Sequence, residues 1–233
     1  MRYKQIIFDV DDTLIDFPKT EDYSLNKLFN SHGLTLTKDL KKKYHTWNQG
    51  MWRKLEKGEI TPQQLNRDTF RIFFKDNFGM KVDGEEVTNE YREYFSQCHE
   101  LLPGVKDTLI YAKRMGYELS VLSNGDTKIQ EKRLSDAGIL NYFDLIVTSE
   151  DAGVSKPDKR IFDYFFDHSD ASAKDTLFFG DGLMSDILGA ERYGFDSIWY
   201  NVRHRKDTIG LHPLFEVDTY EEFVKLMQKD FQK

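Results

Sequence analysis

The sequence has almost no cysteine and no long hydrophobic run. Cys98 is the single cysteine among 233 residues, so an internal disulfide is excluded and a reducing compartment is favoured. No stretch approaches the ~18 apolar residues of a membrane span, and the N-terminus lacks an apolar segment followed by a small-residue cleavage site. These absences predict a cytoplasmic protein that does not bind a membrane.

Basic residues are also outnumbered. The chain has 33 Lys and Arg residues against 40 Asp and Glu residues, which gives a net charge of −7. This balance argues against binding to a nucleic acid polymer or an anionic lipid surface, because both need an excess of positive charge. It does not exclude an anionic small molecule, which responds only to the local field. We expect a monomer or a homodimer with a small-molecule partner.

Two carboxylates follow the first predicted strand. The apolar-ending run 3–7 leads into Phe8-Asp9-Val10-Asp11-Asp12-Thr13-Leu14. A turn that begins at Asp11 lets one side chain and one backbone carbonyl face a single point, and such oxygen ligands suit a hard cation. The alternative is a polar turn without an ion, because Asp-Asp-Thr serves a turn equally well.

The hydrophobic pattern changes twice along the chain. Residues from about 23 to 97 show helical spacing, whereas after residue 101 short apolar strands alternate with helices. The later strands are predicted at Glu118–Leu122, Leu145–Val147, Thr176–Phe179, Ser197–Tyr200 and Phe215–Val217. This alternation predicts an α/β fold, a doubly wound parallel sheet with helices on both faces. Residues 1–16 and 99–233 would form this Rossmann-like core, and residues 17–98 an inserted all-helical domain.

Polar residues recur where the later strands end. Ser123-Asn124-Gly125 follows the second strand, Lys156 comes after the third, and Asp181 follows the fourth with Asp186 five residues on. Each has a simpler explanation: a tight turn, an exposed lysine, a loop, or an acid in the first turn of a helix. Their joint placement favours one site, because ligands bind beyond the carboxyl ends of parallel strands.

The order of these motifs resembles the haloacid dehalogenase superfamily, and specifically its phosphatases. The resemblance covers nearly the whole chain, and residues 17–98 look like the helical cap of the first cap class of that superfamily. The matching motifs are Asp9-Val10-Asp11-Asp12-Thr13, Ser123 after a strand, Lys156 before Pro157, and Gly180-Asp181 with Asp186.

The resemblance implies a role for each core residue. Asp9 would be the nucleophile that forms an aspartyl-phosphate, and Asp11 the general acid and then the general base. Mg²⁺ would be held by the Asp9 side chain, the Asp11 carbonyl and Asp181, which offsets the repulsion between carboxylates and a phosphate dianion. The other implied roles are catalysis and phosphate binding by Ser123 and Lys156, phosphate binding near Asn124 and Gly125, orientation of neighbouring groups by Asp186, and support of the Asp9 loop by Thr13.

The inserted domain suggests the substrate. Its stretch 46–52, Thr-Trp-Asn-Gln-Gly-Met-Trp, resembles the noncanonical pyrimidine nucleotidases, which hydrolyse nucleoside 5′-monophosphates. The resemblance implies that Trp47 and Trp52 stack on a base and that Asn48 hydrogen-bonds its edge. The alternative is that both tryptophans pack the cap helices together, which is the commoner use of a large aromatic side chain.

Other functions use parts of the same pattern. A dehalogenase of the same superfamily would need neither a metal nor the second carboxylate, so Asp11 and Asp181 argue against it. A sugar-phosphate phosphatase or phosphosugar mutase shares the core motifs and differs in the cap, so it remains the main alternative. A switch resembling receiver domains would carry its acceptor at the end of the third strand and would lack the long insertion. A binding-only relative would lack a core motif residue, and none is missing.

Overall fold

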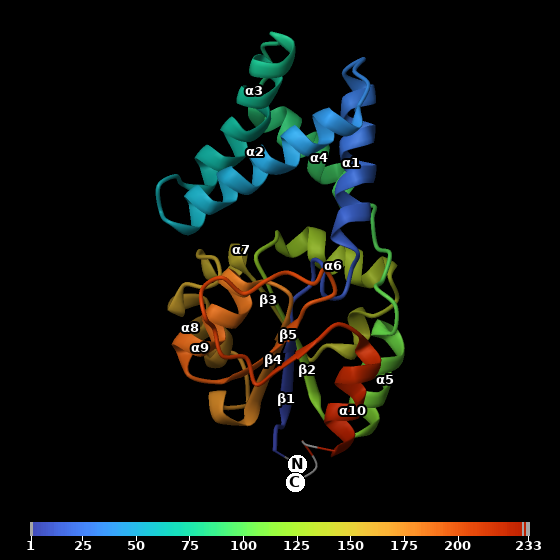
Figure 1. Cartoon of the computed structure of the whole chain (residues 1–233), viewed down its shortest axis with the longest axis vertical. Coiled ribbons are helices and arrows are strands. Elements are labelled where there is room, and N and C mark those ends of the chain that lie inside the picture. The colour runs from blue at the N-terminus through green and yellow to red at the C-terminus, as the bar shows by residue number, and fades with distance from the viewer. Residues whose placement is uncertain (1, 230, 232–233) are drawn as a thin grey trace. The chain divides into compact units, whose positions relative to one another are not determined.

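The computed structural model describes residues 2–229 and residue 231. The chain divides into two compact units, of which one joins Met1–Phe17 to His99–Lys233 and the other is Pro18–Cys98 (Figure 1). The first boundary lies one residue later than the predicted division after residue 16. That the two units are separate domains stays a prediction.

A parallel sheet forms the centre of the first unit, and within the described residues it has six strands. In spatial order they are β3 (Leu145–Thr148), β2 (Glu118–Ser123), β1 (Gln5–Phe8), β4 (Thr176–Gly180), β5 (Asp196–Tyr200) and β6 (Phe215–Val217). β1 lies between β2 and β4, with Phe8 paired to Val121 on one side and to Phe179 on the other. The strand order therefore reverses at β1, and the predicted doubly wound parallel sheet is confirmed.

Helices cover both faces of this sheet. On one face lie α5 (Val105–Arg114), α6 (Thr127–Asp136) and α10 (Tyr220–Lys229), and on the other lie α8 (Lys159–Asp167) and α9 (Leu188–Tyr193). The short elements are η1 (Leu140–Tyr142), α7 (Ser149–Ala152), η2 (Ala173–Asp175) and the π-helical turn η3 (Leu183–Ile187). The central strand supplies both cores, because Ile6 and Phe8 point to the first face and Ile7 to the second.

The second unit is helical, as predicted. Its helices in the described residues are α1 (Phe17–Ser31), α2 (Lys38–Glu56), α3 (Pro62–Phe78) and α4 (Gly84–Ser96). They enclose a separate apolar core made of Leu25, Leu28, Phe29, Tyr44, Phe70, Phe73, Phe74 and Val87. No helix in the described part of the chain is long and apolar enough to cross a membrane.

Local sequence signals set the ends of these helices. Thr61 and Gln64 form a reciprocal capping box at the start of α3. Thr61 Oγ1 accepts from the Gln64 N–H at 3.2 Å, and Gln64 Oε1 accepts from the Thr61 N–H at 2.8 Å. Gly79 ends α3 in the left-handed region, with φ 67°. Gly84 starts α4 where a Cβ would lie 1.7 Å from the Arg67 carbonyl oxygen, so a side chain there would force α3 and α4 apart.

Candidate active site

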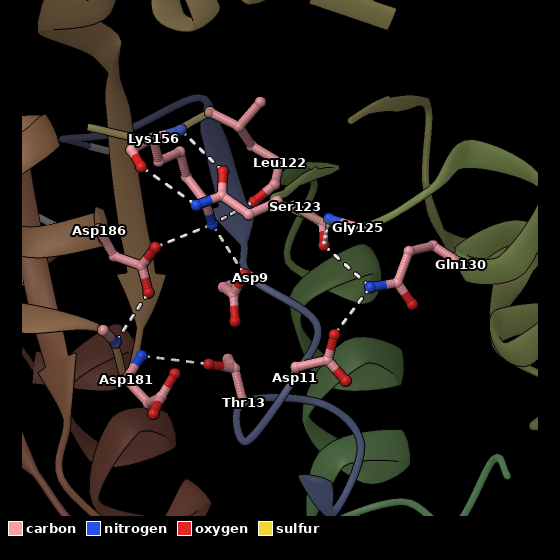
Figure 2. A network of polar contacts seen from close by, with 12 residues as sticks. Asp9, Asp11, Thr13, Leu122, Ser123, Gly125, Gln130, Lys156, Asp181 and Asp186 are labelled. Atoms are coloured by element: carbon pink, nitrogen blue, oxygen red, sulfur yellow. Dashed lines mark hydrogen bonds and ion pairs between the residues drawn. The ribbon is translucent and has the colours of Figure 1, made fainter. Parts of the chain in front are cut away.

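The carboxylate of Asp9 lies at the carboxyl end of the central strand. Its backbone N–H continues the β1–β4 ladder to the Phe179 carbonyl at 3.1 Å, so the sheet fixes where its side chain starts. The residue is 7% exposed, and Oδ1 accepts a hydrogen bond from Lys156 Nζ at 2.7 Å (Figure 2). The predicted nucleophile is therefore buried and rigidly placed.

Lys156 is buried among oxygen atoms. Its ammonium group contacts Asp9 Oδ1 at 2.7 Å, Asp186 Oδ1 at 2.8 Å and the Leu122 carbonyl at 2.6 Å. Burial alone would lower the pKa of this ammonium group, but the two carboxylates outweigh burial and raise it. Because its three N–H groups each face an acceptor, Lys156 supplies the site with a fixed positive charge.

Three buried carboxylates meet at this edge of the sheet. One oxygen atom each from Asp9, Asp181 and Asp186 lies within 4.8 Å of the others. Burial raises the pKa of Asp9 to about 7 against the opposing effect of Lys156, and burial together with Asp9 and Asp186 raises the pKa of Asp181 well above its usual value. These oxygens suit a hard divalent cation, since another positive charge would relieve their repulsion.

Asp186 orients its neighbours through both carboxylate oxygens. Oδ1 pairs with Lys156, and Oδ2 accepts from the Gly182 N–H at 2.9 Å. A Cβ at Gly180 would lie 2.4 Å from Asp186 Oδ2, so the carboxylate occupies the space that a side chain would need. The structure thus places Asp186 inside the site, bonded to the loop that carries Asp181.

Thr13 links the loop after β1 to the end of β4. The residue is fully buried, and its Oγ1 accepts from the Asp181 N–H at 3.1 Å. Its carbonyl accepts from the Tyr220 hydroxyl at 2.7 Å, which ties the same loop to α10. These bonds hold the two acidic segments together.

The Ser123-Asn124-Gly125 loop is braced from two sides. Ser123 Oγ accepts from the Gly125 N–H at 3.2 Å. The Asn124 side chain pairs with the backbone of Lys156, donating to its carbonyl at 3.1 Å and accepting from its N–H at 2.7 Å. The Asn124 side chain therefore aligns this loop with the lysine segment, and its role here is distinct from the phosphate contact predicted near it.

Asp11 makes two contacts with α6 that the motifs did not predict. Arg133 Nη1 donates to Oδ1 and Gln130 Nε2 donates to Oδ2, both at 2.8 Å. The two donors are three residues apart and so share one face of α6. That spacing was a visible signal, but a polar pair on a helix ordinarily indicates solvent exposure.

Arg205 is a second residue that the motifs did not predict. It forms an ion pair with the Asp181 carboxylate and donates to the Asp181 carbonyl at 2.8 Å. It belongs to the run Arg203-His204-Arg205-Lys206 after β5, and a run of basic residues usually indicates a solvated loop. The three acids Asp9, Asp181 and Asp186 are therefore paired with two cationic side chains, Lys156 and Arg205. A further positive charge would bring the cluster closer to neutrality.

The aromatic residues of the cap differ in their surroundings. Trp47 is partly buried against the cap core, and its Nε1 donates to the Thr69 carbonyl at 2.9 Å. Trp52 is 37% exposed, and Asn48 is half-buried. Packing thus accounts for Trp47, whereas Trp52 keeps part of its surface in solvent. Contact of these residues with a substrate stays a prediction.

Comparison with known proteins places the chain in a family. Residues 6–200 match the family model described as haloacid dehalogenase-like hydrolase. The chain belongs to this family. The predicted resemblance is confirmed, and with it the prediction of a hydrolase.

Two curated relatives match this chain over almost their whole length. Pyrimidine 5′-nucleotidase PynA of Streptococcus pneumoniae (strain ATCC BAA-255 / R6) is 32% identical over 231 residues, which cover 99% of this chain and 97% of that protein. Pyrimidine 5′-nucleotidase YjjG of Escherichia coli (strain K12) is 30% identical over 230 residues, covering 98% and 100%. The crystal structure of the family member YfnB of Bacillus subtilis, bound to magnesium, superposes with a TM-score of 0.91 at 34% identity and covers 97% and 99% of the two chains.

Proposed function

We propose that this protein is a cytoplasmic, Mg²⁺-dependent phosphatase that hydrolyses pyrimidine nucleoside 5′-monophosphates through an aspartyl-phosphate on Asp9. The observation that carries the proposal is the buried Asp9 carboxylate, 2.7 Å from Lys156 and grouped with Asp181 and Asp186 at the end of the central strand. Similarity to two proteins named pyrimidine 5′-nucleotidases supports the substrate class.

The reaction proceeds in two displacements at phosphorus. In the first, a carboxylate oxygen of Asp9 attacks phosphorus, the bond from phosphorus to the ester oxygen breaks, and Asp11 gives a proton to the departing oxygen. In the second, Asp11 takes a proton from water as that water attacks phosphorus, and the bond to Asp9 breaks. Inorganic phosphate leaves, and both carboxyl groups return to their starting states.

Neighbouring groups hold the phosphoryl oxygens during both steps. Ser123 supplies a hydroxyl donor, and the backbone N–H of Asn124 lies in the same loop, in which the Gly125 N–H braces Ser123 Oγ. The buried charge of Lys156 stabilises the negative charge on the transferring group and fixes the direction of the Asp9 carboxylate.

The acidic cluster fits a divalent cation. Asp9, Asp181 and the Asp11 carbonyl would hold Mg²⁺, and Asp186 lies close enough to orient them. When bound, Mg²⁺ supplies positive charge that offsets the repulsion between these carboxylates and the phosphoryl oxygens. The magnesium in the YfnB crystal structure supports this choice of ion.

The cap supplies discrimination between esters, because the core residues address only the phosphoryl group. We assign stacking on the pyrimidine to Trp52 and hydrogen bonding to Asn48. To Trp47 we assign a base contact in addition to its packing role in the cap. Loss of a stacking ring costs about 1–3 kcal/mol of nucleotide recognition. Trp52→Ala should therefore lower kcat/KM for a nucleotide with little change in melting temperature, whereas Trp47→Ala should also lower the melting temperature.

A substrate panel tests this function. Phosphate release is measured from deoxyuridine monophosphate, thymidine monophosphate, a hexose phosphate and p-nitrophenyl phosphate, with wild type, Trp47→Ala, Asn48→Ala and Trp52→Ala. We expect the pyrimidine nucleotides to be preferred and the generic ester to be least affected by the cap variants. Preference of the wild type for the hexose phosphate would replace the nucleotidase by a sugar phosphatase, and no release from any ester would overturn the phosphatase.

A further inference from the structure

We propose that Gln130 and Arg133 are positioning residues that hold Asp11 in the orientation needed for proton transfer. The inference rests on the proposed function, because it assigns these two side chains to the acid–base group of that reaction. Both come from α6 and donate to the Asp11 carboxylate. Figure 2 shows Gln130 on the far side of Asp11 from the acidic cluster. No motif in the sequence singled out either residue.

Both carboxylate oxygens of Asp11 have a donor from α6. Arg133 Nη1 lies 2.8 Å from Oδ1, and Gln130 Nε2 lies 2.8 Å from Oδ2. Two donors on two different oxygens fix the side-chain torsions as well as the location of the group. The loop that carries Asp11 is thus anchored by its side chain to the helix that follows β2.

The donors and acceptors around Gln130 allow only one orientation of its amide group. Arg133 has only donors, so the group that faces its Nη1 at 2.9 Å must be the amide oxygen, Oε1. The amide nitrogen then faces Asp11 Oδ2 at 2.8 Å and Ser123 Oγ at 2.9 Å, and each of its two N–H bonds has an acceptor. No other orientation satisfies the three contacts.

The Gln130 amide also determines the direction in which the Ser123 hydroxyl makes its hydrogen bonds. Its Oγ accepts from Gln130 Nε2 and from the Gly125 N–H at 3.2 Å, so both of its lone pairs are used. The remaining function of the hydroxyl is to donate its own hydrogen, which suits a phosphoryl oxygen. Gln130 therefore fixes the acid–base carboxyl group and a phosphate-binding hydroxyl with respect to each other.

Burial and backbone space show that the contact is built into the fold. Arg133 is 0% exposed and Gln130 is 1% exposed, and a buried guanidinium is unfavourable unless it is paired. A Cβ at Gly125 would lie 2.6 Å from Gln130 Nε2, so glycine at this position leaves space for the amide. The buried charge of Arg133 and the absence of a side chain at Gly125 therefore both keep these donors beside Asp11.

Near-isosteric variants separate positioning from folding. Gln130→Met removes the amide and keeps the length of the side chain, and Arg133→Lys keeps the charge but loses the planar donor pair. Glu131→Gln, on the exposed side of the same helix, is the control. Each is compared with Asp11→Asn by kcat/KM and kcat on aryl phosphates of graded leaving-group pKa and on deoxyuridine monophosphate, with thermal melts to verify folding.

Loss of a positioned acid should appear only where the departing oxygen needs a proton. Because kcat/KM reports the first displacement, both variants should lose about 10²-fold on the nucleotide. Both variants should lose far less on dinitrophenyl phosphate, an aryl ester with a low leaving-group pKa, because its phenolate departs without taking up a proton. The plot of log kcat/KM against leaving-group pKa should steepen as in Asp11→Asn, while kcat for the aryl esters falls because the second displacement still needs the base.

Double variants decide the assignment. In an Asp11→Asn background, Gln130→Met should cause a much smaller loss than in the wild type, because the asparagine side chain at position 11 no longer transfers a proton and only the contact of Gln130 with Ser123 remains to be lost. Equal losses on every ester, unchanged kinetics, or full additivity with Asp11→Asn would each overturn the inference while the phosphatase assignment stands. If Arg133→Lys fails to fold, Gln130→Met alone decides the question. Absence of phosphate release by the wild type would overturn the proposed function and this inference with it.

Discussion

Replacing Lys156 by methionine should destabilise the protein strongly, and the loss should grow as the pH rises. Methionine has a similar length and keeps the packing, but it leaves Asp9 and Asp186 without the ammonium group that lies 2.7 and 2.8 Å from them. Burial raises the pKa of Asp9 to about 7, so at low pH this carboxylate can take up a proton and needs the lysine less. At high pH Asp9 is ionised and has lost the ammonium group that balanced its charge.

The size of the effect follows from distance and burial. At an effective dielectric constant of about 20, a unit-charge pair at these distances is worth about 6 kcal/mol. Most of this gain is offset by the cost of removing the ammonium group from water, and breaking a buried pair by removing one partner costs about 3–5 kcal/mol. For a protein of this size, that corresponds to a fall in melting temperature of about 6–20 °C.

A nearby lysine provides the matched control. Lys159 pairs with Asp163 at 2.5 Å, but its side chain is 68% exposed. Such surface pairs contribute about 0–1 kcal/mol, so Lys159→Met should be close to neutral. Urea unfolding of metal-free wild type and both variants at pH 5 and pH 8 measures the difference. Equal losses in the two variants, or a Lys156→Met loss that does not increase with pH, would refute the electrostatic account of this site.

The remaining predictions concern the pH dependence and the metal. Metal-free wild type should lose stability between about pH 4 and pH 7, because the folded state keeps a proton on Asp9, whose pKa is raised from 3.8 to about 7, while the unfolded chain has released it. Melting temperatures of Asp9→Asn should lack this part of the decline, and parallel curves for the two proteins would contradict the raised pKa. Phosphate release should stop in EDTA and return with Mg²⁺ but poorly with Ca²⁺, which takes more ligands at longer distances. Full activity after verified metal removal would exclude the metal roles of Asp9 and Asp181.

The sheet could be predicted because its strands are short apolar runs bounded by turn residues. All six were expected within a few residues of their observed ends, and β6 was expected at Phe215–Val217 as found. The cap helices were visible through their caps, such as Thr61 before Pro62. The segment that precedes α9 is irregular: it forms the π-helical turn η3, because the Gly182 carbonyl accepts from the N–H groups of both Asp186 and Ile187.

The candidate site was predictable only where it coincides with strand ends. Asp9, Ser123 and Asp181 could be placed because parallel strands bring their carboxyl ends to one edge. Gln130 and Arg133 could not, because their partner Asp11 lies 119 and 122 positions away in sequence. An arginine inside a helix normally indicates solvent, and only the tertiary structure shows that this one is buried.

The role of Asp9 is the central claim, and one comparison tests it most directly. Phosphate release from deoxyuridine monophosphate in Mg²⁺ is measured for wild type and for Asp9→Asn, with circular dichroism to verify that both are folded. The account predicts turnover by the wild type and none by the variant, because an amide is a poor nucleophile at phosphorus. Wild-type-like phosphate release from folded Asp9→Asn would contradict the account.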